Sequence, residues 1–223
     1  MHIALIPDGN RRYAKKHALT FEEVYRKGME KFREFVEWCS EFDVNEITAY
    51  ALSLENIEKR SKTELETLAK VLIEEIEKTK NDERIHKNQI NIKICGNLDS
   101  IKRLNKDLFD ALMDLEYATK NYSKNRVNLA VGYGGRQEIM NVIEKFRNSN
   151  EEINDENIRK NLMINNYPDL LIRTGGHRIS NFLLWQIAYT EIYFLNKLWP
   201  EFEKQDLINI IEDYKKTEKR FGK

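Results

Sequence analysis

The chain has 223 residues, and its 37 lysines and arginines equal its 37 aspartates and glutamates, so the formal net charge is zero. A chain of this length can bury a core large enough to fold without disulfides or a structural metal. The balanced charge argues against a general nucleic-acid-binding protein, since those proteins carry an excess of basic residues. The apolar runs are only a few residues long, whereas a membrane-spanning helix needs roughly 20.

The N-terminal residues and the cysteines indicate the cellular compartment of the protein. The N-terminal residues have no basic stretch and only a short apolar run, which is not the pattern of a signal peptide. Cys39 and Cys95 lie far apart and belong to no metal-binding spacing, so we expect two free thiols in a reducing compartment. We therefore expect a cytoplasmic protein.

Short apolar segments alternate along the chain with longer amphipathic ones. In chain order, the predicted strands are residues 3–6, 46–52, 90–95, 127–131, 169–172 and 191–194. Apolar residues at helical spacing predict helices at three places: Phe32, Phe35, Val36 and Cys39; Leu65, Leu68, Ala69, Leu72, Ile73 and Ile76; Leu207, Ile210, Ile211 and Tyr214. The Asn-, Glu- and Lys-rich stretch 148–157 is interpreted as a surface loop.

This alternation of strands and helices favours parallel strand pairing in one α/β domain. The sequence contains no linker rich in Pro, Gly or Ser and no internal repeat, so we expect residues 1–223 to form a single domain. Parallel α/β sheets bind their ligands at the carboxyl ends of the strands. The polar segments that directly follow the predicted strands are therefore the candidates for a functional site.

The first of these segments, residues 7–16, follows the first strand. Gly9 permits a tight turn, and the helix predicted after it offers free backbone N–H groups beside Arg11 and Arg12, which together would bind an anion. Asp8 would repel a phosphate unless a metal ion lay between them, and Mg²⁺ commonly joins a carboxylate to phosphate oxygens. The segment suggests a Mg²⁺-diphosphate site, but an Asp-Gly-Asn turn before a solvated basic helix explains it equally well.

Two further segments have simpler explanations. After the second strand, Ser53, Glu55 and Asn56 could hold a polar substrate group, although a helix cap by Ser53 or Asn56 is the favoured interpretation. The glycine-rich residues 132–136 after the fourth strand could approach a ligand closely, but a tight turn between strand and helix is favoured there. Neither segment indicates a function by itself.

The segment after the fifth strand is more informative. Arg173 and Arg178 flank a Gly-Gly pair, and Ser180 lies just beyond them. Arginine forks bind phosphate through paired charge-assisted hydrogen bonds, so we favour a second phosphate site over a surface loop capped by Ser180. The single histidine of this loop, His177, does not by itself indicate catalysis.

Together these segments resemble those of one family. The residues that carry the resemblance stand in the family's order and span the whole chain: 2–14, 50–56, 132–136, 169–186, 191–194 and 198–200. The Arg-Thr pair that begins at Arg173 and the Ser-Asn-Phe-Leu-Leu-Trp-Gln run that begins at Ser180 are the most specific. The chain resembles the cis-prenyltransferases, which are the undecaprenyl and dehydrodolichyl diphosphate synthase family.

This resemblance implies a fold and a reaction. The fold would be a mainly parallel six-stranded sheet surrounded by helices, with an apolar tunnel whose one wall is the stripe from Leu65 to Ile76. The enzyme would be a homodimer that uses Mg²⁺ to condense isopentenyl diphosphate with an allylic prenyl diphosphate in cis configuration. The product would be a polyprenyl diphosphate lipid carrier, and its insolubility implies peripheral contact with a membrane during release. No nucleic-acid partner is expected.

The resemblance also implies what each candidate residue does. The ligands of Mg²⁺ would be Asp8 and Glu191. The allylic diphosphate would be bound by Gly9, Asn10, Arg11 and Arg12. The isopentenyl diphosphate would be bound by Arg173, Arg178 and Ser180, together with Arg220 and Gly222 of the neighbouring subunit. The catalytic residues around the reacting carbons would be Asp8, Asn10, Ser53, Glu55 and Asn56.

The chain departs from the family pattern after the first basic helix. Phe21 and Tyr25 stand where the family has an Arg and a His that hold the allylic diphosphate, and Lys59 or Arg60 would have to serve for a displaced basic residue. These departures leave alternatives open. The chain could be a short-chain, irregular or acceptor-directed prenyltransferase on the same fold. It could also be a non-catalytic subunit of a heteromeric enzyme, which the retained Asp8 disfavours.

Overall fold

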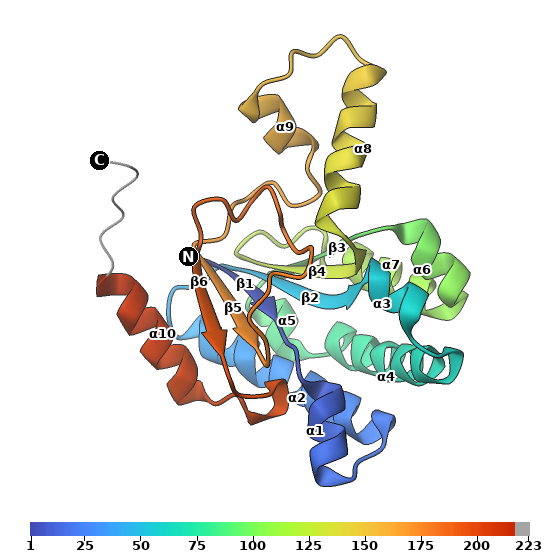
Figure 1. Cartoon of the computed structure of the whole chain (residues 1–223), viewed down its shortest axis with the longest axis vertical. Helices are drawn as coiled ribbons and strands as arrows, with labels where there is room; N and C mark the ends of the chain where they lie inside the picture. Colours follow the sequence, from blue (N-terminus) through green and yellow to red (C-terminus); the bar gives the residue numbers. More distant parts are fainter. Residues whose placement is uncertain (217–223) are drawn as a thin grey trace.

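The computed structural model describes residues 1–216 of the chain (Figure 1). Its centre is one sheet of six strands in the order β3-β4-β2-β1-β5-β6, and all neighbouring strands in it run parallel. The predicted α/β fold with a mainly parallel six-stranded sheet is confirmed, and every pair of neighbouring strands in it is parallel. The strands are β1 (His2–Ile6), β2 (Glu46–Ser53), β3 (Ile90–Cys95), β4 (Asn125–Tyr133), β5 (Leu170–Thr174) and β6 (Glu191–Leu195).

Each predicted strand is present, with ends that differ from the prediction by at most two residues. The difference at β5 matters, because the strand continues to Thr174 and thereby includes Arg173. Arg173 lies in register with Ile6 of β1 on one side and with Phe194 of β6 on the other. This arginine is therefore positioned by the sheet itself and not by a loop.

Helices connect the successive strands except β5 and β6, and the three predicted apolar stripes lie on α2, α4 and α10. None of the described helices is both long enough and apolar enough to cross a membrane. The helices are α1 (Asn10–His17), α2 (Phe21–Ser40), α3 (Leu54–Lys59), α4 (Lys62–Lys80), α5 (Glu83–Lys87), α6 (Leu98–Leu104), α7 (Lys106–Thr119), α8 (Gly135–Arg147), α9 (Asp155–Asn161) and α10 (Lys204–Lys216), with a 3₁₀ helix, η1 (Trp199–Glu201).

The predicted surface loop at 148–157 is partly wrong. Its last residues form the first turn of α9, which begins at Asp155. The side chain of Asn154 caps this helix by accepting a hydrogen bond from the backbone N–H of Asn157 over 2.9 Å. Asparagine favours such a cap as much as it favours a loop, so composition alone did not separate the two structures.

Side chains alternate between the two faces of the sheet and form two apolar layers. On one face, Ile3 and Leu5 of β1 belong to a large core with residues of α2, α4, α7 and α10. On the other face, Ala4 and Ile6 pack in a smaller core that includes Phe182. Figure 1 shows α2, α4 and α10 beside one face of the sheet and α8 and α9 on the opposite side.

Candidate active site

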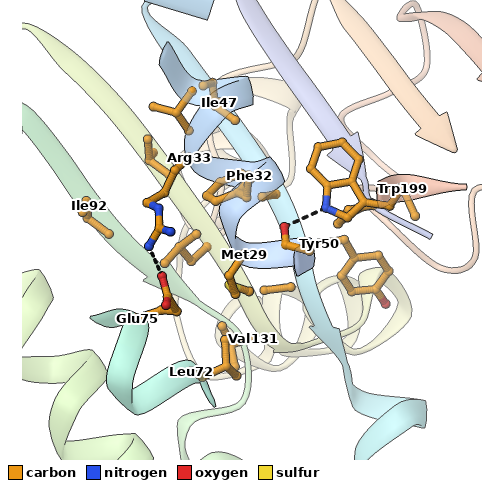
Figure 2. Close-up of a pocket in the computed structure, with 18 of the residues that line it drawn as sticks. Met29, Phe32, Arg33, Ile47, Tyr50, Leu72, Glu75, Ile92, Val131 and Trp199 are labelled. Atoms are coloured by element: carbon orange, nitrogen blue, oxygen red, sulfur yellow. Dashed lines mark hydrogen bonds and ion pairs between the residues drawn. The ribbon is translucent and has the colours of Figure 1, made fainter. Parts of the chain in front are cut away.

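A long cavity of about 910 Å³ runs between the sheet and helices α2 and α4. Polar residues gather where the cavity meets the carboxyl ends of the strands, and we call this part the polar end. The tunnel wall predicted on α4 is partly confirmed, because Leu68, Leu72 and Ile76 line the cavity whereas Leu65 and Ala69 do not. The apolar lining (Figure 2) also includes Met29, Phe32, Ile47, Ile92 and Val131.

Asp8 and Arg173 meet at the polar end. Nη2 of Arg173 donates a hydrogen bond to Oδ2 of Asp8 over 2.7 Å, and Nη2 of Arg12 lies 3.3 Å from Oδ1 of the same carboxylate. The carbonyl oxygen of Asp8 accepts hydrogen bonds from Oγ1 of Thr174 over 2.8 Å and from the backbone N–H of Trp199 over 3.0 Å. The structure thus brings together one carboxylate and two guanidinium groups and fixes the backbone that carries the carboxylate.

Arg173 is a buried cation with one donor unused. Its side chain is 6% exposed, and Nη1 donates to Oγ of Ser180 over 2.6 Å and to the carbonyl oxygen of Arg178. Its Nε is buried without a hydrogen-bond partner. Gly176 permits this packing, since a Cβ there would lie 2.9 Å from Nη2 of Arg173. A desolvated guanidinium with an unsatisfied donor is suited to bind an anion.

The start of α1 provides a second set of donors. Gly9 precedes this helix with a φ of 116° and no side-chain cap, so the first turn keeps free backbone N–H groups. Asn10 begins the helix and lines the cavity, and its Oδ1 is buried without a partner. Gly28 on α2 leaves room for Asn10, because a Cβ there would lie 2.9 Å from that oxygen. The helix terminus therefore faces the same space as Asp8.

The segment after β2 closes one side of the polar end. Ser53 caps α3 by accepting a hydrogen bond from the backbone N–H of Asn56 over 3.0 Å, so the interpretation as a helix cap is confirmed for Ser53. Ser53, Glu55 and Asn56 all line the cavity as well. Glu55 accepts a 2.6 Å hydrogen bond from Nδ2 of Asn181, which joins this segment to the one after β5. The same residues thus form a cap and a wall of the cavity.

The segment after β5 contains strained backbone. Ser180, Asn181 and Leu183 have φ values of 50°, 63° and 48°, in a region that residues other than glycine rarely adopt. The backbone N–H of Gly135 donates to the carbonyl oxygen of Asn181 over 2.7 Å and supports this conformation. Residues 132–136 do not line the cavity. They form the favoured tight turn from β4 into α8, and they contact the segment after β5 through this hydrogen bond.

Sequence reasoning missed a buried cluster beside the polar end. Tyr25 on α2 donates to Oε1 of Glu64 on α4 over 2.6 Å and accepts from Nη1 of Arg60 over 3.0 Å. Glu64 is almost fully buried, and burial raises the pKa of the Tyr25 hydroxyl above its usual value. Arg60 and Lys59 both line the cavity, but the structure desolvates Arg60, whose Nε is buried without a partner. A glutamate in the first turn of a helix gives no signal of burial.

The polar end carries more positive than negative charge. The basic residues that line it are Arg11, Lys59, Arg60, Arg173 and Arg178, and the acidic ones are Asp8 and Glu55. The excess is local, since the chain as a whole has no net charge. A concave site of this polarity attracts and concentrates anions.

Two predicted parts of the site are not assembled in the described residues. Glu191 begins β6 in register with Leu170, at the amino end of β5, whereas Asp8 follows the carboxyl end of β1. Within one chain the length of the strands therefore separates the two carboxylates, and the role of Glu191 as a second ligand of Mg²⁺ stays a prediction. Arg220 and Gly222 lie outside the described residues.

The chain matches a known family over almost its whole length. Residues 6–222 match the family described as "Putative undecaprenyl diphosphate synthase". The chain belongs to the undecaprenyl diphosphate synthase family. The resemblance of the sequence to the cis-prenyltransferases is therefore confirmed.

Relatives in this family cover the full chain. A tritrans,polycis-undecaprenyl-diphosphate synthase (geranylgeranyl-diphosphate specific) of Pyrobaculum aerophilum is 43% identical over 231 residues, which span 100% of this chain and 95% of that protein. The protein of the same description from Thermoplasma acidophilum is 40% identical over 100% of this chain and 88% of its own length.

Two crystal structures share the fold. Lavandulyl diphosphate synthase from Lavandula x intermedia, in complex with dimethylallyl diphosphate, is 31% identical with a TM-score of 0.91, and the match covers 100% of this chain and 98% of that one. A probable undecaprenyl diphosphate synthase from Campylobacter jejuni is 31% identical with a TM-score of 0.83 and the same coverage. The parallel sheet surrounded by helices is therefore the fold of this cis-prenyltransferase family.

Proposed function

We propose that this chain is a Mg²⁺-dependent cis-prenyltransferase that elongates an allylic prenyl diphosphate with isopentenyl diphosphate and makes a polyprenyl diphosphate. The observation that carries the proposal is a cavity of about 910 Å³ whose cation-rich polar end leads into an apolar part. An allylic diphosphate has the same two parts, because its diphosphate is anionic and its hydrocarbon tail is apolar.

Two groups of donors support two diphosphate positions. The free N–H groups at the start of α1, together with Asn10 and Arg11, would bind the allylic diphosphate. They lie at the entrance to the apolar part of the cavity, and the hydrocarbon tail of this substrate must enter that part. Arg173 and Ser180, which are hydrogen-bonded to each other, would bind the diphosphate of isopentenyl diphosphate. The short alkene of this substrate needs no tunnel. Asp8 lies between the two groups and contacts Arg173.

The reaction breaks the bond between the allylic carbon and its diphosphate and joins that carbon to the alkene of isopentenyl diphosphate. Loss of a proton from the added unit completes the elongation. Negative charge builds on the departing diphosphate, and guanidinium and N–H groups that are already oriented stabilise this charge more than that of the bound substrate. The residues at the polar end would therefore bind the substrates, orient them and stabilise the leaving group.

The residues at the polar end fit Mg²⁺. This ion usually takes one or two protein carboxylates and obtains its other ligands from water and from substrate phosphates. Asp8 offers one carboxylate, which is 38% exposed. Within residues 1–216, no group of three or more His, Cys, Asp or Glu side chains is arranged to hold a metal ion, so most of the remaining ligands would come from the substrate. When bound, Mg²⁺ would neutralise charge on the leaving diphosphate.

We propose geranylgeranyl diphosphate as the allylic primer. The support is the description of two relatives as specific for it, at 43% and 40% identity over the whole of this chain. Tyr25 and Phe21 replace the His and Arg of the family pattern, and Arg60 would supply the missing basic contact. Its hydrogen bond to Tyr25 holds this arginine at the cavity wall.

We further propose that the enzyme is a cytoplasmic homodimer in which each chain completes the site of the other. The support is the position of Glu191 on an outer strand of the sheet, at the end of the strands opposite to Asp8, where its own chain cannot use it. The free, buried thiols of Cys39 and Cys95 suit a reducing compartment. The apolar product would leave through peripheral contact with a membrane.

Mixing two inactive variants tests the shared site. Asp8→Ala and Glu191→Ala should each abolish elongation as pure proteins. A mixed dimer has one site with both carboxylates, so co-expression with two different affinity tags should restore about a quarter of the wild-type activity if the chains pair at random. Isolated mixed dimers without activity would contradict the shared site.

An elongation assay tests the reaction itself. Purified protein is incubated with Mg²⁺, labelled isopentenyl diphosphate and a panel of allylic diphosphates, and the dephosphorylated products are sized by chromatography. We expect a ladder of polyprenols, with the highest incorporation from geranylgeranyl diphosphate. A product of one condensation would instead favour the short-chain or irregular reaction, to which the likeness to lavandulyl diphosphate synthase points. No incorporation with any primer would favour the non-catalytic subunit.

A further inference from the structure

An ion pair joins α2 to α4 within the apolar part of the cavity. Arg33 on α2 and Glu75 on α4 both line the cavity, and Figure 2 shows their side chains meeting among apolar residues that include Phe32 and Leu72. The Glu75 side chain is 9% exposed, and its other carboxylate oxygen accepts a 2.6 Å hydrogen bond from Nζ of Lys78. Apolar residues line the cavity between the polar end and this pair, whereas Glu37 and Thr79 line it one turn deeper on the same two helices.

The pair lies well below the polar end. Both helices start beside that end, where Tyr25 of α2 contacts Glu64 of α4. Arg33 is eight residues further along α2 and Glu75 is eleven residues further along α4. At 1.5 Å per residue their backbones therefore lie about 12 Å and about 17 Å deeper. Beyond the pair the cavity continues past Ile85 to polar residues near the amino ends of the strands: Asn88, Asn125 and Arg126.

The pair changes what a hydrocarbon tail meets as it advances. Above the pair, Met29, Phe32 and Leu72 offer apolar surface, and burial of such surface is favourable by about 25 cal/mol per Å². At the pair, a tail would remove solvent from two charged groups without replacing their hydrogen bonds. Burial of Glu75 also reduces the solvent screening of its attraction to Arg33, whose side chain is 38% exposed, and this attraction opposes their separation.

A second ion pair between the same helices provides a comparison. Nη1 of Arg26 lies 2.6 Å from Oε2 of Glu74, and neither residue lines the cavity. Joining α2 to α4 therefore does not require charges inside the cavity. We propose that Arg33 and Glu75 determine product specificity: their ion pair is the floor against which the growing prenyl tail stops, and it limits the number of isoprenoid units added. This inference rests on the proposed elongation reaction.

Removing both charges tests the floor directly. The double variant Arg33→Leu with Glu75→Leu replaces the pair by apolar side chains, and Arg26→Leu with Glu74→Leu is the matched control outside the cavity. Each protein elongates geranylgeranyl diphosphate with labelled isopentenyl diphosphate, and products are sized by chromatography. We expect the main product of the inner double variant to be longer by one or more isoprenoid units, whereas the outer variant keeps the wild-type product. An active inner variant with the wild-type product would overturn the proposal.

A second variant covers the case in which the inner double variant does not fold. Ile85 lines the cavity beyond the pair, so Ile85→Trp narrows only the part that the tail should not reach. The expected product is that of the wild type, and a shortened product would show that the tail passes the pair and would refute the floor. Failure of the proposed function is separate, because the wild-type protein would then make no polyprenyl product at all.

Discussion

Nη2 of Arg173 donates a 2.7 Å hydrogen bond to Oδ2 of Asp8, although 165 positions separate the two residues in the sequence. The contact forms because β1 and β5 are neighbours and Arg173 lies in register with Ile6, two residues before Asp8. Each side chain thereby restrains the other at the polar end. A carboxylate that can hold a metal ion and a guanidinium that can hold a diphosphate are thus positioned before any substrate binds.

Replacing Asp8 by Asn should separate charge from shape. The amide is close in size to the carboxylate and can still accept the hydrogen bond from Arg173, but the buried guanidinium loses its counter-charge, so we expect a folded protein with a lowered melting temperature. Loss of the negative charge removes the ligand proposed for Mg²⁺, which contributes several kcal/mol and corresponds to a fall in kcat of about 100-fold or more. Steady-state elongation assays over a range of Mg²⁺ concentrations measure this. Unchanged turnover in the folded variant would contradict the assignment of Asp8.

Replacing Arg173 by Lys should weaken one substrate more than the other. Lysine keeps the charge but loses the planar fork that contacts Asp8 and Ser180. We expect KM for isopentenyl diphosphate to rise about 10- to 100-fold, equivalent to one or two charge-assisted hydrogen bonds, and KM for the allylic primer to rise much less. Arg103→Lys, an exposed position on α6, is the control. Equal increases in both KM values would place Arg173 elsewhere in the site.

Replacing Tyr25 by Phe should release Arg60 without removing it. The hydroxyl contacts both Arg60 and Glu64, and its loss should lower the free energy of unfolding by about 1–3 kcal/mol. We also expect KM for the allylic diphosphate to rise several-fold, because Arg60 loses its hydrogen bond to Tyr25 and keeps only the 3.5 Å ion pair with Glu64. Tyr117→Phe, at a tyrosine that is 69% exposed, should change neither quantity. If the Tyr25 variant is destabilised but its KM values are normal, the cluster of Tyr25, Arg60 and Glu64 has only a structural role.

Stability should decrease as the solution becomes mildly acidic, because of His2. Its ring is buried and Nε2 forms a 2.7 Å hydrogen bond with Oγ1 of Thr48. Burial lowers the pKa of His2 below its ordinary value of 6.5, although the charge of Glu46 opposes the effect in part. As pH falls through about 6.5, the unfolded chain therefore binds a proton that the folded chain does not, and the free energy of unfolding falls until the folded-state pKa is passed.

Urea unfolding at several pH values measures this slope. His2→Asn should flatten the decrease between about pH 7 and the folded-state pKa, where each unit of pKa difference corresponds to about 1.4 kcal/mol. His17 is exposed, so His17→Asn is the control, and its free energy of unfolding should depend on pH as that of the wild type does. If His2→Asn retains the full slope, another group is responsible for it.

Much of the fold follows from short-range patterns. The apolar residues of β1 and the stripe on α4 occupy a few neighbouring positions each, and such periodicity indicates strand or helix directly. Asp8 and Arg173 could be singled out separately, because each is polar and directly follows a predicted strand. Their contact was not predictable from periodicity, since it depends on β5 pairing with β1.

The parallel α/β class, the charged segments at the ends of the strands and the family of the chain could all be predicted from the amino-acid sequence. These properties depend on residues within one segment and on the order of segments along the chain. Three relationships came from the folded chain alone: the hydrogen bond of Tyr25 to Glu64, the ion pair of Arg33 and Glu75 inside a cavity, and the separation of Glu191 from Asp8. Strand order and the packing of helix faces join residues many positions apart, and local periodicity contains no information about such pairs.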